Sequence, residues 1–183
     1  SVAILGVAKN TLRSHQAEDG DDLILAVDLS GQRGCSSVTS WDANSGKTTD
    51  EILFRLDALP AIADNHWSCA AKDISNAGIL GTISIFMENS GKGCTIDVGT
   101  IPRPDSIPLA DWLHCFQSFG FILAVPPDHS PEVLDLFASK NVDAAVVGKV
   151  DRTDRVIIKN KQERRTLFDF TTDEITGIRY DGS

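Results

Sequence analysis

The pattern of apolar and polar positions along the chain predicts a sheet of buried strands. Residues 23–29 and 119–125 are almost continuously apolar, which is typical of strands that are covered on both faces. Shorter apolar runs predict further strands, and the last of them is expected at a sheet edge. The predicted strands are residues 2–8, 23–29, 94–98, 119–125, 144–150, 156–159 and 166–168. A turn at residues 152–154 predicts that the runs on either side of it pair as a hairpin.

Apolar residues that recur at helical spacing predict helices between these strands. The first is capped by Thr48 or Thr49 and runs to about residue 64, and Pro60 is expected to kink or split it. The second ends in residues 90–93 with a glycine suited to the left-handed cap, and the last begins with the cap, proline and acid of residues 130–132. The predicted helices are residues 49–64, 77–89, 109–116 and 130–140.

The order of these elements predicts an α/β fold of the α+β type, in which helices pack on a layered sheet. Consecutive strands at both ends of the chain argue against a purely parallel sheet. The glycine-bearing residues 30–34 and the polar residues 36–47 are expected to form loops. The chain has 183 residues, of which 42% are hydrophobic, so it is long enough for one domain with a substantial core.

The apolar run at residues 2–8 also leads to an expectation about the natural protein. The chain does not begin with Met, and its first residues already have the pattern of a buried strand. We therefore expect the chain to be a fragment or a processed product. Residues 1–19 are expected to be the end of a preceding domain, or the link from it.

Charge and composition narrow the range of partners. The chain has 26 Asp and Glu residues against 17 Lys and Arg, a formal net charge of −9. This balance argues against nucleic acid or an anionic membrane as the main partner, but a small anion needs only a few local donors. No apolar stretch approaches the ~20 residues of a membrane span, and no signal peptide is visible. The four cysteines are far apart in sequence, which favours free thiols in a reducing cytoplasm over disulfides or zinc.

Residues 72–81 are the most informative segment for function, because polar and small residues stand directly before a predicted helix. A helix N-terminus presents free backbone N–H groups and a partial positive charge, which suit a phosphate. Asp73 is the candidate catalytic acid. The candidates for substrate or phosphate binding are Lys72, Ser75, Asn76, Ala77 and Gly78. The alternative is an ordinary capped helix with Ser75 as its N-cap, an Asp73 that fixes the loop, and a Lys72 on the surface.

Two further segments supply candidate binding residues. Ser30 and Gly31 follow a strand, where layered sheets often bind ligands, although a plain turn is the simpler interpretation. Phe119, Gly120 and Phe121 could shape an acceptor pocket, with core packing as the alternative. The histidines have no arrangement typical of catalysis, and no residue is assigned as a metal ligand.

The order of these motifs resembles the C-terminal domain of the superfamily of aminoimidazole ribonucleotide (AIR) synthase. Thiamine-monophosphate kinase, selenophosphate synthetase and the hydrogenase maturation protein HypE are relatives in this superfamily, and the similarity is closest to the AIR synthase-related proteins. It extends from about residue 20 to residue 150. The matching segments are residues 20–31, 73–81, 90–93, 96–97, 119–126 and 147–150.

The resemblance implies a three-layer α/β/α domain with a mixed sheet, which closes over a nucleotide and an acceptor in a two-domain protein. In this family the N-terminal domain carries an acidic metal site, most of the ATP site and the main dimer interface. ATP, Mg²⁺, a missing N-terminal domain, a small-molecule substrate and a second copy of the chain are therefore the implied cofactors and partners.

The implied chemistry is ATP-dependent phosphoryl transfer to a small metabolite, or its ATP-driven activation. Residues 1–183 would then be the acceptor-side domain, which is expected to be inactive on its own. The alternative is a non-catalytic small-molecule-binding or assembly module that kept the fold.

The chain departs from the family pattern at two positions of the motif. The usual form is Asp-Ile-Ser-Asp-Gly-Gly-Leu, whereas Asn76 replaces the second acid here and Ala77 the first glycine. Asn can form hydrogen bonds, but it cannot act as a general base or give magnesium a charged ligand. The Gly-Gly-Glu-Asp-Tyr run of the thiamine-phosphate kinases is also absent near Gly120, which argues against that specific activity.

Overall fold

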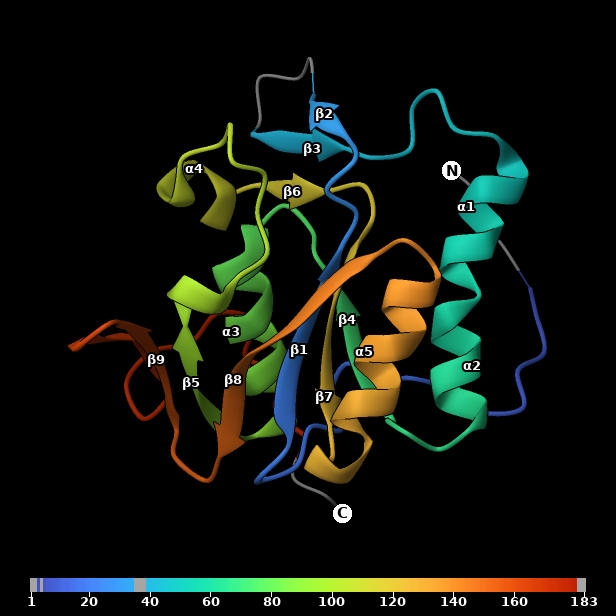
Figure 1. Ribbon diagram of the computed structural model, residues 1–183. Helices are drawn as coiled ribbons and strands as arrows, with labels where there is room; N and C mark the ends of the chain where they lie inside the picture. The colour runs from blue at the N-terminus through green and yellow to red at the C-terminus, as the bar shows by residue number, and fades with distance from the viewer. Residues whose placement is uncertain (1–2, 4, 35–38, 181–183) are drawn as a thin grey trace.

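A seven-stranded mixed sheet forms the centre of the structure, a computed structural model that describes residue 3, residues 5–34 and residues 39–180 (Figure 1). In spatial order the strands are β10 (Glu163–Asp169), β9 (Arg155–Asn160), β5 (Gly93–Asp97), β8 (Asp143–Asp151), β1 (Asp22–Val27), β7 (Gly120–Val125) and β4 (Ala70–Asp73). Neighbouring strands are antiparallel except β5 and β9, which are parallel. The expected mixed sheet is therefore confirmed.

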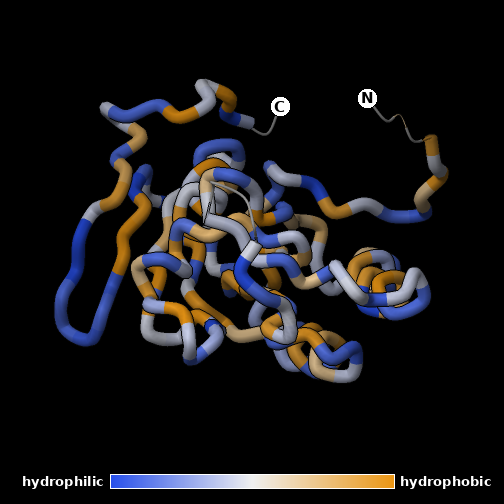
Figure 2. Tube along the Cα trace, turned by 90° about the horizontal axis from the view of Figure 1, so that it is seen from above, coloured by the Kyte–Doolittle hydropathy of each residue, from blue (hydrophilic) through white to orange (hydrophobic). Residues whose placement is uncertain are grey.

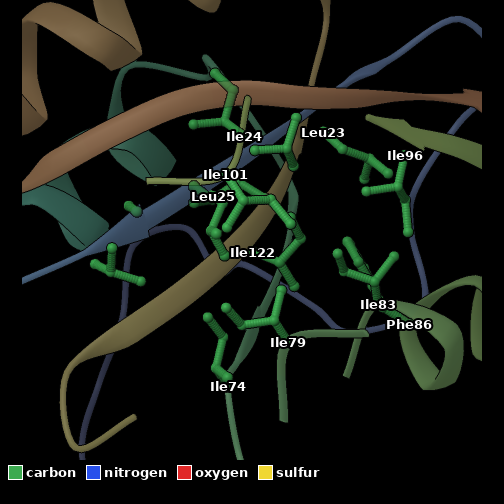
Figure 3. Close-up of a cluster of buried hydrophobic side chains, with 14 of the residues drawn as sticks. Leu23, Ile24, Leu25, Ile74, Ile79, Ile83, Phe86, Ile96, Ile101 and Ile122 are labelled. Carbon is green, nitrogen blue, oxygen red and sulfur yellow. The ribbon is translucent and has the colours of Figure 1, made fainter. Parts of the chain in front are cut away.

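Helices cover both faces of this sheet and complete a three-layer α/β/α arrangement. One face carries α3 (Gly78–Ser90), and the other carries α1 (Thr49–Leu56), α2 (Ala58–Asp64) and α5 (Ser130–Ser139) (Figure 1). Ile79 and Ile83 of α3 belong to one buried hydrophobic cluster with Leu23, Leu25 and Ile122 of the sheet (Figure 3). Because alternate side chains of a strand point to opposite faces, the long apolar runs supply core residues to both layers.

A smaller three-stranded sheet lies at the end of the large sheet where β1 ends and β7 begins (Figure 1). It consists of β2 (Gln32–Arg33), β3 (Ser40–Asp42) and β6 (Phe116–Gln117), with α4 (Leu109–Leu113) beside it. Two short 3₁₀ helices, Val98–Thr100 and Pro127–His129, complete the described elements. The rings of Trp41 and Trp112, 5.3 Å apart between centroids, form an edge-to-face contact that joins β3 to α4.

Most of the expected signals at helix ends are confirmed, but the expected cap at Ser130 is wrong, because Ser130 is the first residue of α5 and His129 is the N-cap. The helix predicted over residues 49–64 is split in two, and Pro60 lies in the first turn of α2, where a missing N–H costs little. Thr48 caps α1, because its side chain accepts a hydrogen bond from the amide of Glu51 and the Glu51 side chain accepts one in return. Gly91 ends α3 in the left-handed conformation, with φ at 62°.

The strand expected at residues 2–8 is wrong in the described part of that range. Residues 3 and 5–8 form no strand, the Leu5 side chain is fully exposed, and residues 2 and 4 lie outside the described residues. Figure 2 shows this segment running apart from the rest of the chain. An apolar run becomes a strand only where a sheet edge offers it partners, and the edge of β4 is occupied near Ala70 by Arg13.

Strand pairing also differs from the sequence prediction. The predicted hairpin of β8 and β9 is absent from the described sheet, because β5 lies between these strands. The hairpin is instead formed by β9 and β10, and it extends from the edge of the molecule with hydrophilic residues at its tip (Figure 2). β10 is an edge strand, as expected for residues 166–168. Residues 36–47, expected to be a loop, contain β3, although residues 36–38 lie outside the described part.

Candidate functional site

The residues predicted from the sequence to form a site lie at one end of the large sheet. β1 and β4 are both antiparallel to β7, so they end on the side where β7 begins. Gly120 pairs with Val27 of β1, and Asp73 of β4 pairs with Phe121. The loop after β1, the start of β7 and the segment between β4 and α3 are therefore neighbours, although they are far apart in sequence (Figure 1).

Asp73 is the last residue of β4 and lies at the outer edge of the sheet. Its side chain is 68% exposed, whereas that of Lys72 is 20% exposed, and the Lys72 Nζ lies 3.7 Å from the Asp73 Oδ1. An ion pair of such exposure contributes at most about 1 kcal/mol. The Asp73 carboxylate is therefore held only weakly within the fold and is accessible to a ligand.

A cavity of about 460 Å³ opens beside Asp73. It lies between β4, α2 and residues 10–14 of the N-terminal segment, and Lys72, Asn10 and Ser14 are its other polar lining residues. Its apolar lining comes from Leu12, Leu59, Pro60, Ala63, Ala71 and Phe121. The cavity is open to solvent and its lining is both polar and apolar, and its volume lies within the range of small-molecule sites.

The segment between β4 and α3 is only partly open to solvent. The N-cap of α3 is Ala77 and its side chain makes no capping bond, so the prediction of Ser75 as the N-cap is wrong. The amide of Gly78 donates to the Ser75 carbonyl at 2.8 Å, and the amide of Ser75 donates to the Thr82 hydroxyl at 3.3 Å. Gly78 has a φ of 68°, and a Cβ there would lie 2.6 Å from the carbonyl carbon of His114. The residue that follows α4 thus covers the start of α3.

Asn76 and Ala77 are the exposed members of this segment. The amides of Ser75 and Gly78 already have acceptors within the fold. A phosphate at the start of α3 would therefore depend mainly on the groups of Asn76 and Ala77.

The loop after β1 is organised by Asp28, which the sequence analysis did not select. Asp28 is 2% exposed and accepts hydrogen bonds from the Ser30 amide and hydroxyl at 2.8 and 2.6 Å. It also forms ion pairs with the buried Arg55 and, at 3.2 Å, with Lys47. A Cβ on Gly31 would lie 2.4 Å from a backbone oxygen of β3. This packing explains Ser30 and Gly31 as structural residues. The sequence feature that could have identified Asp28 is a carboxylate inside an apolar run.

Phe119 and Gly120 are packed into the end of the sheet. Phe119 is buried, with the Arg55 guanidinium carbon 4.8 Å from its ring centroid and the Phe121 ring in edge-to-face contact at 5.4 Å. A Cβ on Gly120 would lie 2.7 Å from the Gln117 Cβ. Of the three residues expected to shape an acceptor pocket, only Phe121 is among the residues that line this cavity.

Comparison with known proteins identifies the family of this chain. The profile of the family described as AIR synthase related protein, C-terminal domain, matches residues 18–161. The chain belongs to this family. An uncharacterized protein of Methanocaldococcus jannaschii is 34% identical over 178 residues, which are 96% of this chain and 55% of the relative. An uncharacterized protein of Synechocystis sp. is 31% identical over 180 residues, which are 98% of this chain and 56% of that relative. The chain thus spans about half the length of these curated relatives.

Solved structures show the same AIR synthase-related fold. Phosphoribosylformylglycinamidine synthase II from Thermotoga maritima has a TM-score of 0.70 and 14% identity, covering 86% of this chain and 26% of that chain. The hydrogenase maturation protein HypE in complex with ATP has a TM-score of 0.63 and 14% identity, and the match covers 86% of this chain and 53% of that chain. At this level of identity the likeness shows the fold and not a common reaction.

The described part of this AIR synthase-related domain does not fit a magnesium site of its own. It contains no group of three or more His, Cys, Asp or Glu residues that could hold a metal ion. Asp73 offers one carboxylate, and Asn76 beside it is uncharged, whereas Mg²⁺ sites usually combine carboxylates with phosphate oxygens. Cys69, Cys94 and Cys115 are free thiols, as expected, and Cys35 lies outside the described residues. Among the described helices, none has the length and apolar character needed to cross a membrane.

Proposed function

We propose that this domain binds the acceptor in an ATP-dependent reaction of the AIR synthase type. The reaction would be phosphoryl transfer to a small metabolite or its ATP-driven activation. The observation that carries the proposal is the exposed Asp73 carboxylate beside a cavity of about 460 Å³, in a domain of this family. Fold relatives have been solved with ATP, namely PurL of T. maritima and HypE, which supports ATP as the source of energy.

Asp73 would orient the acceptor hydroxyl or amine and accept its proton as the acceptor oxygen or nitrogen bonds to the γ-phosphorus of ATP and ADP leaves. Lys72, whose Nζ lies 3.7 Å from the carboxylate, would balance its charge before the acceptor enters. Asn76 can donate to or accept from the acceptor, but it cannot take up a proton. The domain's own part is therefore to position the acceptor.

ATP would supply the phosphoryl group and would be bound together with Mg²⁺. We place both mainly on residues outside this chain, in a preceding domain, because the described residues lack a cluster of metal ligands. The same proposal includes a homodimer formed through that preceding domain. It also includes a cytoplasmic location, which the free thiols support.

The test uses the longest natural protein that contains this chain. Isothermal titration with ATP and Mg²⁺ is expected to show binding both for Asp73→Asn and for the unaltered protein. ATP turnover with acceptor is expected to fall roughly 100-fold in Asp73→Asn. The matched control is Asp135→Asn, an exposed position on α5, which is expected to keep full turnover. A complete lack of nucleotide binding would overturn the proposal.

The second candidate function is a binding module that kept the fold without the chemistry. Asn76 in place of an acid and the covered start of α3 favour it. The discriminating variant is Asn76→Asp in the same full-length protein, screened for ATP hydrolysis. Inactivity both before and after the change supports the binding module, whereas clear activity of the unaltered protein excludes it.

A further inference from the structure

We infer that the cavity beside β4 binds the apolar ring of a small amine or alcohol, whose polar group lies against Asp73. This inference names the acceptor class of the proposed function and rests on it for the reaction. Binding itself requires only the residues that line the cavity, so it is tested without ATP.

The lining of the cavity favours an apolar ring. Leu59 and Pro60 of α2 are apolar lining residues, and Phe121 of β7 contributes an aromatic side chain. The Phe121 ring is held by its edge-to-face contact with Phe119 at 5.4 Å, so this part of the lining is formed before a ligand enters. Ala63 and Ala71 add small apolar side chains to the lining. A planar apolar body would cover these surfaces and exclude water from them.

The charges at the cavity favour a hydrogen-bond donor over an anion. The Asp73 side chain is more than three times as exposed as that of Lys72, so the carboxylate is the charge that an entering ligand meets first. Asp64, whose Oδ1 accepts a hydrogen bond from the Asn10 side chain at 3.4 Å, adds a second negative charge near the N-terminal side of the cavity. An ammonium or hydroxyl group would donate to Asp73, whereas a carboxylate or phosphate would face the charges of Asp73 and Asp64 and could pair only with the less exposed Lys72 of the lining.

This ligand differs from the phosphate expected at the start of α3. The amides of Ser75 and Gly78 are bonded within the fold, whereas the Asp73 carboxylate is exposed beside the cavity. This chain therefore binds the apolar and proton-donating part of a metabolite.

The experiment is an NMR titration of the 183-residue chain with three probes of similar shape: benzylamine, benzyl alcohol and benzoate. Benzylamine and benzyl alcohol are expected to shift the amide signals of Ala71, Lys72 and Phe121. The Kd of benzylamine is expected to be at least about threefold lower than that of benzoate, because only the amine gains from the Asp73 charge. In Asp73→Asn this preference should disappear, and in Asp135→Asn it should persist.

A second pair of variants tests the cavity rather than the charge. Ala71→Leu fills the space beside Phe121 and should abolish the shifts from all three probes, whereas Ala138→Leu, at an exposed position of α5, should leave them unchanged. Equal or tighter binding of benzoate, or probe binding that survives Ala71→Leu, overturns the inference. Probe binding in a full-length protein that fails to bind ATP would leave this site standing while the proposed function fails.

Discussion

Asp28 and Asp73 follow two strands that end at the same side of the sheet, yet one carboxylate is buried and the other is exposed. Asp28 follows the interior strand β1, and it is bonded to Ser30, Lys47 and Arg55. Asp73 ends the edge strand β4, where its contact with Lys72 spans 3.7 Å. The comparison shows that these two carboxylates differ in how many partners the fold supplies. The Asp28 carboxylate, whose partners come from the fold, stabilises the fold, whereas the Asp73 carboxylate at the sheet edge remains available to a ligand.

The largest expected effect is on stability, in Asp28→Ala. Removing this carboxylate leaves the guanidinium of Arg55 buried without its ion-pair partner. The free energy of unfolding is expected to fall by about 3–5 kcal/mol. Urea unfolding at pH 7 followed by circular dichroism measures it. A loss below about 1 kcal/mol, the range of a surface pair, would place Asp28 in the same class as Asp73 and break the comparison.

A somewhat smaller effect is expected at the start of α3. Gly78→Ala combines a left-handed φ of 68° with a Cβ 2.6 Å from the His114 backbone, and it should cost about 2–4 kcal/mol. Gly46→Ala is the matched control, because Gly46 has a φ of 83° but nothing within 4 Å of its Cβ, and it should cost about 1–2 kcal/mol. Equal costs in thermal or urea unfolding would mean that the start of α3 is not covered.

A third carboxylate, Glu88, extends the comparison to the other end of α3. It is buried, and it accepts hydrogen bonds from the amides of Ile175 and Thr176, each at 2.8 Å. Burial acts to raise the pKa of Glu88, but hydrogen bonds from Thr176, Ile175 and Gly177 outweigh it, so the pKa lies below its ordinary value. The carboxylate thus ties the C-terminal segment to α3.

Because the pKa of Glu88 is lowered in the folded state, its stabilisation is present above the unfolded-state pKa of about 4.3. This stabilisation is lost as the pH falls through the folded-state pKa. Glu88→Gln is expected to lower the free energy of unfolding by about 1–3 kcal/mol at pH 7, and the difference from the unaltered chain should shrink toward pH 3. Urea titrations at both pH values measure this, and a difference independent of pH would contradict the assignment.

Much of the fold could be predicted from the sequence, because burial on both faces leaves a continuous apolar run. β1, β7 and β8 follow from such runs, and the break between α1 and α2 follows from Pro60. The short β4 could not be predicted, because only Ala70 and Ala71 are apolar in it. The pairing of β5 between β8 and β9 depends on competition between strands across the whole sheet, which no local turn reveals.

The candidate site was predictable to the extent that it depends on local pattern. A carboxylate before a helix directed attention to Asp73, which the structure places at a cavity. Phe121 was expected near an acceptor pocket, but the Asp28–Arg55 pair and the α2 residues that line the cavity with Phe121 depend on tertiary contacts between distant segments. For the same reason the sequence could not show that His114 covers Gly78, since spacing reveals which groups are polar but not which partners reach them.

The most direct test of this account measures two quantities in Asp73→Asn of the 183-residue chain, the free energy of unfolding and the Kd of benzylamine. The account predicts a free energy of unfolding within about 0.5 kcal/mol of the unaltered chain and a Kd that rises at least about threefold. A loss of several kcal/mol, or an unchanged Kd, would contradict the claim that the edge carboxylate serves a ligand while the interior one serves the fold.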